Sequence, residues 1–311
     1  MEKKIIFMGT PIFASEILKQ LLANGYKIDL VVSQPDKKVG RKQIITPTPV
    51  KTVAIENNIP VFQPQKIRED YQPIIDLNPD LIITAAYGQI VPDEVLACPT
   101  IECINVHGSL LPKYRGGAPI HYSVLNGDSE TGVTIMKMVT KMDAGAIISQ
   151  ASFPIAENDT TAIVHDNMIG VGAKLLLETL PSILSQEYTL TEQDPSLVTY
   201  SPNISKDDER INWNRSAWEV HNQIRGLSSW PGAYTMLDGE RFKIYLSNVT
   251  TIPANGIVGS IAQVDDEAIY VNCIDCQVKL MRVQPAGKKQ LDTKDFVRGI
   301  DKSGYVGRTF E

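Results

Sequence analysis

The sequence predicts an α/β fold, in which a parallel sheet covered by helices is followed by a smaller domain of β-strands. Two observations predict it. Up to about residue 188, continuous apolar runs of strand length alternate with helix-length segments, as in a parallel sheet covered on both faces. Beyond residue 208, short alternating segments are separated by glycines. The length of 311 residues also exceeds the size at which a single core stops growing, so we expect two domains.

The first predicted domain spans residues 1–188. Its first strand is followed by a helix whose apolar residues recur at helical spacing and which Gly25 ends. The alternation then continues along the chain. We predict strands at residues 4–8, 27–32, 61–62, 81–84, 101–106, 132–138 and 147–153, and helices at residues 13–22, 50–56, 67–77, 118–125 and 160–184.

A polar stretch with two prolines, residues 189–208, is predicted to be a linker. It leads to a second domain at residues 209–311, which opens with a helix at residues 216–225. Short strands are predicted after this helix, at residues 233–236, 242–249, 257–264, 269–271 and 278–283. Their spacing indicates a small barrel, with an OB-like β-barrel as the first candidate and other small barrels left open.

Composition and charge bear on the class of protein. No apolar run approaches the roughly 18 residues that span a bilayer, and the four-residue run near the N-terminus is too short for the core of a signal peptide. We therefore expect a cytoplasmic protein without membrane contact. The net charge of −6 gives no support to a general affinity for nucleic acid. However, Lys37, Lys38, Arg41 and Lys42 cluster in one loop, which is either solvated surface or an arm that contacts phosphate.

The four cysteines form two closely spaced pairs, Cys98 with Cys103 and Cys273 with Cys276. Four thiolates can bind zinc, but these pairs lie in strand-like stretches without knuckle glycines or neighbouring histidines. The second pair does not begin a helix, as a redox pair does. We expect structural cysteines and no metal.

The segment from Asn105 to Gly117 is the most informative part of the chain. Asn105 and His107 are two residues apart at the end of an apolar strand, so their side chains share one face at the carboxyl end of that strand. Open α/β sheets bind their ligands there. Asp143 lies in a second loop beside Gly145. An amide, an imidazole and a carboxylate suit acyl transfer, so we predict that Asn105, His107 and Asp143 are catalytic; for Asp143 the alternative is a turn-forming role.

Motifs for several other chemistries are missing from the sequence. The first turn lacks the Gly-x-Gly-x-x-Gly of dinucleotide binding, and neither a P-loop nor a Gly-x-Ser-x-Gly nucleophile elbow occurs. The sequence therefore argues against a dehydrogenase, against phosphoryl transfer from ATP and against a serine nucleophile.

Residues 105–112, with residues 115–120, resemble the signature of the folate-dependent formyltransferases. Downstream, residues 131–136 and 142–145 are similar to the same family. Other segments resemble the branch of the family that acts on aminoacylated initiator tRNA, namely residues 34–37, 40–42, 47–51, 86–90, 230–233 and 284–289. The resemblance covers essentially the whole chain.

This resemblance implies a Rossmann-like formyltransferase domain followed by an OB-like domain that binds tRNA. It implies transfer of a formyl group from N10 of 10-formyltetrahydrofolate, a co-substrate used without a metal, to the α-amine of methionine on initiator tRNA. The folate contacts carried over from the family are Ser109, Leu110, Leu111 and Pro112. The residues expected to contact tRNA are Lys37, Lys38, Arg41, Lys42, Lys288 and Lys289.

Two other functions stay open on the sequence alone. One is a folate-dependent formyltransferase acting on a small amine, and the other is an RNA-binding protein with a degenerate enzyme core. Residues 206–311 are neutral overall, with 14 Lys+Arg and 14 Asp+Glu. This neutral C-terminal part and the basic loop favour tRNA over a small amine as the substrate. The complete Asn/His/Asp set speaks against a degenerate core. We expect a monomer.

Overall fold

The computed structural model describes residues 3–40 and 42–311. It contains two compact units, each interrupted in the sequence. The first consists of the chain up to Pro119, with Thr131–Phe153 and His165–Pro202, and the second of Ile120–Glu130, Pro154–Val164 and Asn203–Glu311. Arg41, one of the predicted tRNA contacts, lies outside the described residues.

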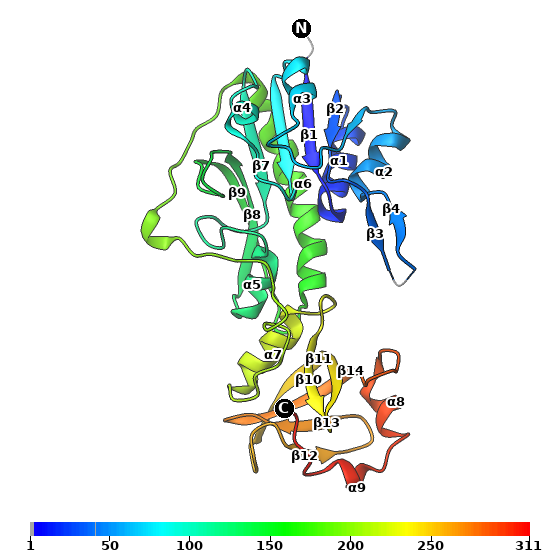
Figure 1. Cartoon of the computed structure of the whole chain (residues 1–311). Coiled ribbons are helices and arrows are strands. Elements are labelled where there is room, and N and C mark those ends of the chain that lie inside the picture. The colour runs from blue at the N-terminus through cyan, green and yellow to red at the C-terminus, as the bar shows by residue number, and fades with distance from the viewer. Residues whose placement is uncertain (1–2, 41) are drawn as a thin grey trace. The chain divides into compact units, whose positions relative to one another are not determined.

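The first unit is built on a seven-stranded sheet in the order β5-β2-β1-β6-β7-β8-β9 (Figure 1). The strands from β5 to β7 in this order are parallel, and β8 runs antiparallel to β7. This order confirms the predicted α/β class. The strands are β1 (Ile5–Gly9), β2 (Leu30–Val32), β5 (Val61–Phe62), β6 (Leu81–Ala85), β7 (Glu102–His107), β8 (Glu130–Lys137) and β9 (Ile147–Pro154).

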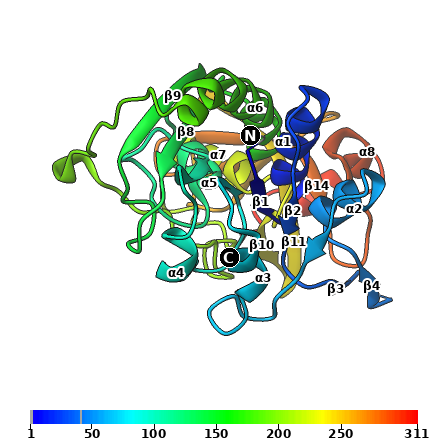
Figure 2. The ribbon, with the colours of Figure 1, turned by 90° about the horizontal axis from the view of Figure 1, so that it is seen from above.

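Helices cover both faces of this sheet, with α1 and α6 on one face and α3 and α4 on the other (Figure 2). Ile74 of α3 and Val95 of α4 are fully buried in one core with Met8 of β1. On the opposite face, α6 packs at Gly172 against side chains of β7 and β8. The helices are α1 (Ile12–Ala23), α2 (Pro49–Glu56), α3 (Gln72–Leu77), α4 (Asp93–Leu96), α5 (Pro119–Leu125) and α6 (Thr161–Ser185), and a 3₁₀ turn, η1, follows at Pro195–Leu197.

The helix α6 is, among the described helices, the one long and apolar enough to cross a membrane by length and composition. Such helices also occur as core helices of proteins without membrane contact. Met168, Leu176 and Ile183 of α6 are fully buried inside the first unit. The apolar character of this helix is therefore used in packing against the sheet.

Some elements differ from the sequence-based prediction. The helix expected at residues 67–77 begins only at Gln72, because the amide of Ile67 donates to Oε1 of Gln89 (2.8 Å) instead of entering a helix. Ile67 is fully buried, so its apolar signal came from tertiary packing. The basic loop contains an unpredicted antiparallel hairpin of β3 (Lys37–Val39) and β4 (Ile44–Thr46).

The second unit is built on an antiparallel sheet in the order β10-β11-β14-β13-β12, with β15 paired to β14. The strands are β10 (Ala233–Leu237), β11 (Glu240–Pro253), β12 (Ile261–Val264), β13 (Ile269–Asn272), β14 (Cys276–Gln284) and β15 (Leu291–Asp292), and the helices are α7 (Ala217–Gly226), α8 (Thr293–Val297) and α9 (Lys302–Tyr305). Strand β12 is shorter than the predicted 257–264, because the chain turns at Gly259 (φ 82°).

The last residues of the chain join the two outer strands of this sheet. Met236 of β10 exchanges two backbone hydrogen bonds with Glu311 (2.9 and 3.0 Å). The amide of Phe310 donates to the carbonyl of Gly259 (2.9 Å), and the carbonyl of Arg308 accepts from the amide of Ile261 at the start of β12 (2.8 Å). Residues 308–311 therefore close the sheet into a barrel, and we call them the seam segment.

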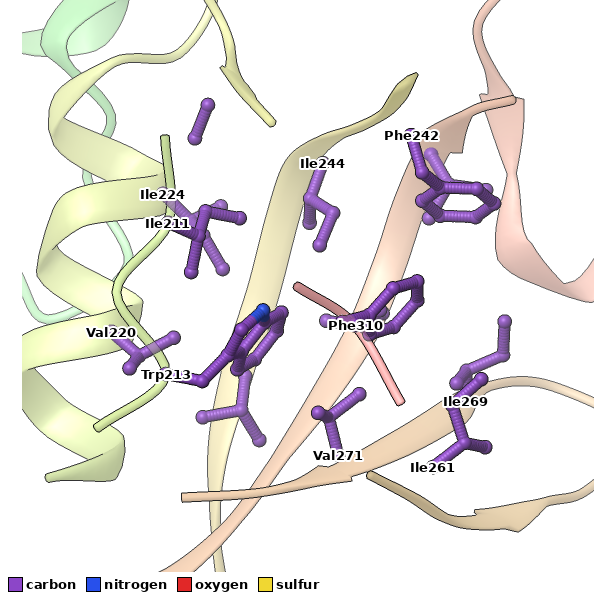
Figure 3. Close-up of a cluster of buried hydrophobic side chains, with 14 of the residues drawn as sticks. Ile211, Trp213, Val220, Ile224, Phe242, Ile244, Ile261, Ile269, Val271 and Phe310 are labelled. Atoms are coloured by element: carbon purple, nitrogen blue, oxygen red, sulfur yellow. The ribbon is translucent and has the colours of Figure 1, made fainter. Parts of the chain in front are cut away.

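The core of the barrel is aromatic and aliphatic (Figure 3). Trp213 stacks on Phe310 of the seam segment, with ring centroids 5.6 Å apart, and its indole N–H donates to Thr235 (3.0 Å). The helix α7 lies against this core through Val220 and Ile224, both fully buried. The Ser216 capping box, in which Ser216 and Glu219 bond each other's backbone amides, fixes the start of α7.

Candidate active site

Asn105 and His107 lie at the carboxyl end of β7, as predicted. Their side chains share one face of the strand because they are two residues apart. In the sheet, Asn105 is the register partner of Thr84 on β6, and His107 is the register partner of Thr134 on β8. His107 is 5% exposed and Asn105 is half-buried, so the amide is the more accessible of the two groups.

The side-chain amide of Asn105 is oriented by its neighbour. The Thr84 hydroxyl, itself buried, donates to Oδ1 of Asn105 across 2.9 Å. With Oδ1 directed at Thr84, the Nδ2 group is at the other end of the amide. Asn105 is thus presented as a hydrogen-bond donor at the end of the strand.

The His107 ring is held between two oxygen atoms. Its Nε2 lies 3.0 Å from the carbonyl oxygen of Tyr114, and its Nδ1 lies 3.7 Å from Oδ1 of Asp143. Because a carbonyl oxygen only accepts, the proton of a neutral ring belongs on Nε2. The Nδ1 atom then carries a lone pair, and its distance from Asp143 is longer than that of a hydrogen bond.

Asp143 is brought to His107 by a tight loop after β8. Its backbone is left-handed (φ 49°), and its Oδ2 accepts a hydrogen bond from the amide of Gly116 (2.8 Å). One carboxylate thus faces both the ring and the loop after β7. The turn-forming alternative describes the backbone of Asp143 correctly, but its side chain is also directed at His107.

The expected folate segment, residues 109–112, is fixed largely by its backbone. Ser109 is fully buried and its hydroxyl donates to the carbonyl of Lys113 (2.6 Å). Thr134 accepts from the amide of Leu111 (3.1 Å) and donates to the carbonyl of Ser109 (2.7 Å). The Ser109 hydroxyl is therefore committed to the protein, whereas Leu110 and Pro112 are partly exposed.

The lysines at the β3–β4 hairpin are exposed. Asp36, which precedes the hairpin, does not neutralise them, because it pairs with Lys51 (2.6 Å) and accepts from Gln63 (2.8 Å). These hydrogen bonds lower the pKa of Asp36, and the bond from Gln63 has the largest effect. Exposed Val39, Ile44 and Ile45 add an apolar surface to the hairpin. The lysines predicted here are Lys37, Lys38 and Lys42, all exposed.

Lys288 and Lys289 lie in the exposed turn between β14 and β15. This turn is shaped by Gly287 in a left-handed conformation (φ 70°) and by a hydrogen bond from Gln284 to the carbonyl of Lys288 (3.0 Å). Both side chains extend from the second unit, whereas the hairpin lysines belong to the first. The predicted lysines therefore belong to two different units.

Two residues near the site were not predicted from the sequence. Arg115 and Gln193 are buried (6% and 9% exposed) and hydrogen-bonded to each other. Arg115 lies inside the Asn105–Gly117 motif, and its position there was the available signal. Gln193 lies in the predicted linker, where nothing in the local sequence marks it.

The described residues contain no group of three or more His, Cys, Asp or Glu arranged to hold a metal ion. The four cysteines are free thiols. Burial raises the pKa of Cys273 to about 12 and raises that of Cys103 further. Cys103 lies in β7, and Cys273 directly follows β13.

Two family models match this chain. The model described as formyl transferase matches residues 3–180, and the model described as formyl transferase, C-terminal domain, matches residues 203–301. Among solved structures, the sugar 3N-formyl transferase WlaRD, in the presence of dTDP and 5-N-formyl-THF, has a TM-score of 0.70 at 22% identity, covering 93% of this chain and 100% of that chain. The N-formyltransferase from Helicobacter canadensis, in complex with folinic acid and dTDP-3-aminofucose, has a TM-score of 0.69 at 24% identity, covering 91% and 99%.

The chain therefore belongs to the formyl transferase family, as its motifs indicated. Its curated relatives are more specific. It is 46% identical over 303 residues to the methionyl-tRNA formyltransferase of Enterococcus faecalis, covering 96% of this chain and 97% of the relative. It is 48% identical over 310 residues to that of Lactobacillus johnsonii, covering 97% of each.

Proposed function

We propose that this chain transfers the formyl group of 10-formyltetrahydrofolate to the α-amine of methionine on initiator tRNA. The observation that carries the proposal is the His107–Asp143 pair beside Asn105 at the end of β7. It occurs in a chain that is 46% identical, over nearly its full length, to methionyl-tRNA formyltransferases. The product, N-formylmethionyl-tRNA, serves the initiation of translation.

The reaction begins when the amine nitrogen attacks the formyl carbon. The amine must lose a proton, and the Nδ1 lone pair of His107 is available to accept it. The imidazolium that forms lies beside the Asp143 carboxylate, whose negative charge stabilises it. No covalent nucleophile on the protein is required.

The tetrahedral species carries a negative charge on the former formyl oxygen. The Nδ2 group of Asn105 is the donor directed away from Thr84, and we assign it to this oxygen. A fixed donor of this kind favours the transition state because it needs no reorientation as the charge develops. The reaction ends when the bond to N10 breaks and His107 returns the proton to N10. The formyl group is then on the amine, and tetrahydrofolate is released.

The folate co-substrate fits the chemistry of this site. A formamide carbonyl needs one donor, and the amide of Asn105 supplies it. Ser109 to Pro112 follow directly after β7, and we propose that their backbone and the partly exposed Leu110 and Pro112 contact the folate. Because the Ser109 hydroxyl is bonded to Lys113, we assign Ser109 a contact through its backbone only.

The tRNA is proposed to contact two basic groups. The hairpin lysines 37, 38 and 42, with Arg41, form the first group, and Lys288 and Lys289 form the second. The charge of the hairpin is available to phosphates because Asp36 is engaged with Lys51 and Gln63. We further propose that the protein acts as a monomer in the cytoplasm, with a catalytic domain at residues 1–188, a linker at 189–208 and a tRNA-binding domain at 209–311.

The test is a formylation assay with 10-formyltetrahydrofolate and two acceptors, methionyl-initiator tRNA and glycinamide ribonucleotide. We expect formylation of the tRNA and not of the small amine. Formylation of glycinamide ribonucleotide alone would identify the site as that of a small-amine formyltransferase. Binding of tRNA without any turnover would identify a non-catalytic RNA-binding protein.

A further inference from the structure

The segment predicted to be a linker is bonded to both loops of the candidate active site. We call residues 191–201 the strap. At one end, Thr191 exchanges two backbone hydrogen bonds with Ile147 of β9 (2.8 and 2.9 Å). At the other end, the Arg115 amide donates to the carbonyl of Thr199 (2.9 Å), and the Ser201 amide donates to the carbonyl of Arg115 (2.8 Å). These two bonds flank a parallel β-bridge between Arg115 and Tyr200. The strap is thus fixed to the first unit at both ends.

The strap bonds the two left-handed residues that build the site. Tyr114 (φ 62°) supplies the carbonyl oxygen that faces Nε2 of His107, and Asp143 (φ 49°) supplies the carboxylate that faces Nδ1. The Tyr114 amide donates to the Thr199 hydroxyl (2.9 Å), and the Ser201 hydroxyl donates to the Tyr114 carbonyl (3.1 Å). Residues with a Cβ atom adopt this conformation only where their surroundings hold them in it.

The side chain of Gln193 holds the backbone of the Asp143 loop by hydrogen bonds. Its Nε2 donates to the carbonyl oxygens of Asp143 and Gly145, both at 2.8 Å. Its Oε1 accepts from two nitrogens of the Arg115 guanidinium, at 3.0 and 2.7 Å. Two donors and two acceptor sites are all that an amide possesses, so the orientation of this buried side chain is determined.

We propose that Gln193 is a positioning residue for the formyl transfer, holding the Asp143 loop in the left-handed conformation that aims its carboxylate at His107. Without the two donors of Gln193, the loop is free to leave this conformation, and the carboxylate moves away from the ring. The Gln193–Arg115 pair also ties the Asp143 loop to the loop after β7, so that both sides of His107 are set together. The activity readout for this inference rests on the proposed function.

The test compares two glutamines with the same bonding pattern. Gln223 of α7 is also 9% exposed, and it donates to the carbonyls of Asp208 (3.0 Å) and Arg210 (2.8 Å), but it belongs to the second unit. Gln193→Glu and Gln223→Glu each keep the shape and the acceptor oxygen while removing both donors. Gln193→Glu also keeps a partner for Arg115.

We expect Gln193→Glu to lower kcat for methionyl-tRNA formylation by roughly tenfold to a hundredfold, as for a misplaced catalytic group, with KM for both substrates nearly unchanged. Its rate–pH profile should change as well. Gln223→Glu should keep the wild-type kcat and profile, even if it unfolds at lower temperature. A folded Gln193→Glu protein with wild-type kcat would overturn the proposal, as would an equal loss of kcat in both variants.

A second measurement does not depend on activity. The chain has four histidines, so the ring signals in a ¹H–¹³C NMR spectrum are few and His107 can be assigned with His107→Gln. We expect the His107 signal to move in Gln193→Ala and to stay in place in Gln223→Ala. Failure of the formylation assay with a displaced His107 signal would reject the proposed function and keep the positioning role. An unmoved signal in a folded Gln193→Ala protein would reject the positioning role.

Discussion

The hydroxyl of Thr84 donates a hydrogen bond to Oδ1 of Asn105, across 2.9 Å and between two neighbouring strands. An asparagine amide has a donor end and an acceptor end, and the chemistry of formyl transfer needs the donor. The contact favours that end, because Oδ1 faces the Thr84 hydroxyl, whose single proton has the Ile104 carbonyl (3.0 Å) and the Met138 sulfur (3.1 Å) as its other acceptors. Thr84 is therefore part of the reason why Asn105 is suited to an oxyanion.

Asn105→Ala should lower kcat by roughly 10²–10³, the loss that follows removal of one oxyanion donor. Folate binding should change little, since the donor acts on charge that develops during the reaction. Thr84→Val should give a smaller loss, because it keeps the amide and removes only its orientation. Steady-state kinetics of the two variants, with folate binding measured separately, check this order. A Thr84→Val enzyme slower than Asn105→Ala would contradict it.

Asp143→Asn keeps the shape of the side chain and an oxygen for the Gly116 amide, but removes the charge beside His107. We expect a large loss of rate together with a changed dependence of rate on pH, since the imidazolium formed in the reaction loses its counter-ion. Rates across the pH range, measured for both proteins, decide the matter. If the two proteins have similar rates and the same dependence of rate on pH, Asp143 only forms a turn.

Arg41→Ala and Lys38→Ala test the hairpin. Specific RNA recognition uses unstacked ends of strands, and we expect the hairpin to contact the acceptor end of the tRNA. Both changes should lower kcat/KM for methionyl-initiator tRNA and leave folate binding intact. Arg41→Ala should also weaken discrimination between tRNAs with a weak and a strong terminal base pair. Lys66→Ala, in the first unit but outside the hairpin and paired with Glu69, is the matched control. Unchanged kinetics and discrimination would make the hairpin solvated surface.

Lys288→Ala tests the second basic group. A contact with a phosphate contributes to affinity without sequence preference and releases a counter-ion, so its loss should reduce the slope of log Kd against log salt by about one. The slope is measured from tRNA binding at several salt concentrations. Lys302→Ala, a lysine of the same unit already paired with Asp266, should leave the slope as it is. If both slopes equal that of the wild type, Lys288 does not contact phosphate.

His221 should make the second unit sensitive to acid. Its ring is buried between the Ser247 hydroxyl and the carbonyl of Glu157, both at 3.0 Å, and burial lowers its pKa below 6.5, with a further contribution from the charge of Arg225. As pH falls through about 6.5, the unfolded chain takes up a proton that the folded protein resists, so stability decreases. His221→Gln should flatten this dependence in urea unfolding measured from pH 7 to pH 5. Equal dependence in both proteins would show that another group is responsible.

The sheet, its helices and the positions of Asn105, His107 and Asp143 were predictable because their signals are local. Buried strands are continuous apolar runs, and residues two apart on a strand share a face whatever the rest of the fold does. The β3–β4 hairpin was not predicted, because its two strands are only three residues long and fully exposed, so neither shows the alternation of a half-buried strand. The bonds of the strap, which lies within the proposed linker, could not be predicted, since they are polar bonds to residues far away in the sequence, such as that of Gln193 with Asp143.

Residues 308–311 leave the ribosome after every other strand of the barrel. Until they emerge, Met236 on β10 and Ile261 on β12 lack these backbone partners, and the aromatic core lacks Phe310. Open edges are the surfaces through which nascent chains associate with one another. The final step of folding in this unit is therefore delayed until residues 308–311 have been translated. Slow translation of these residues, or truncation before them, should leave an aggregation-prone product.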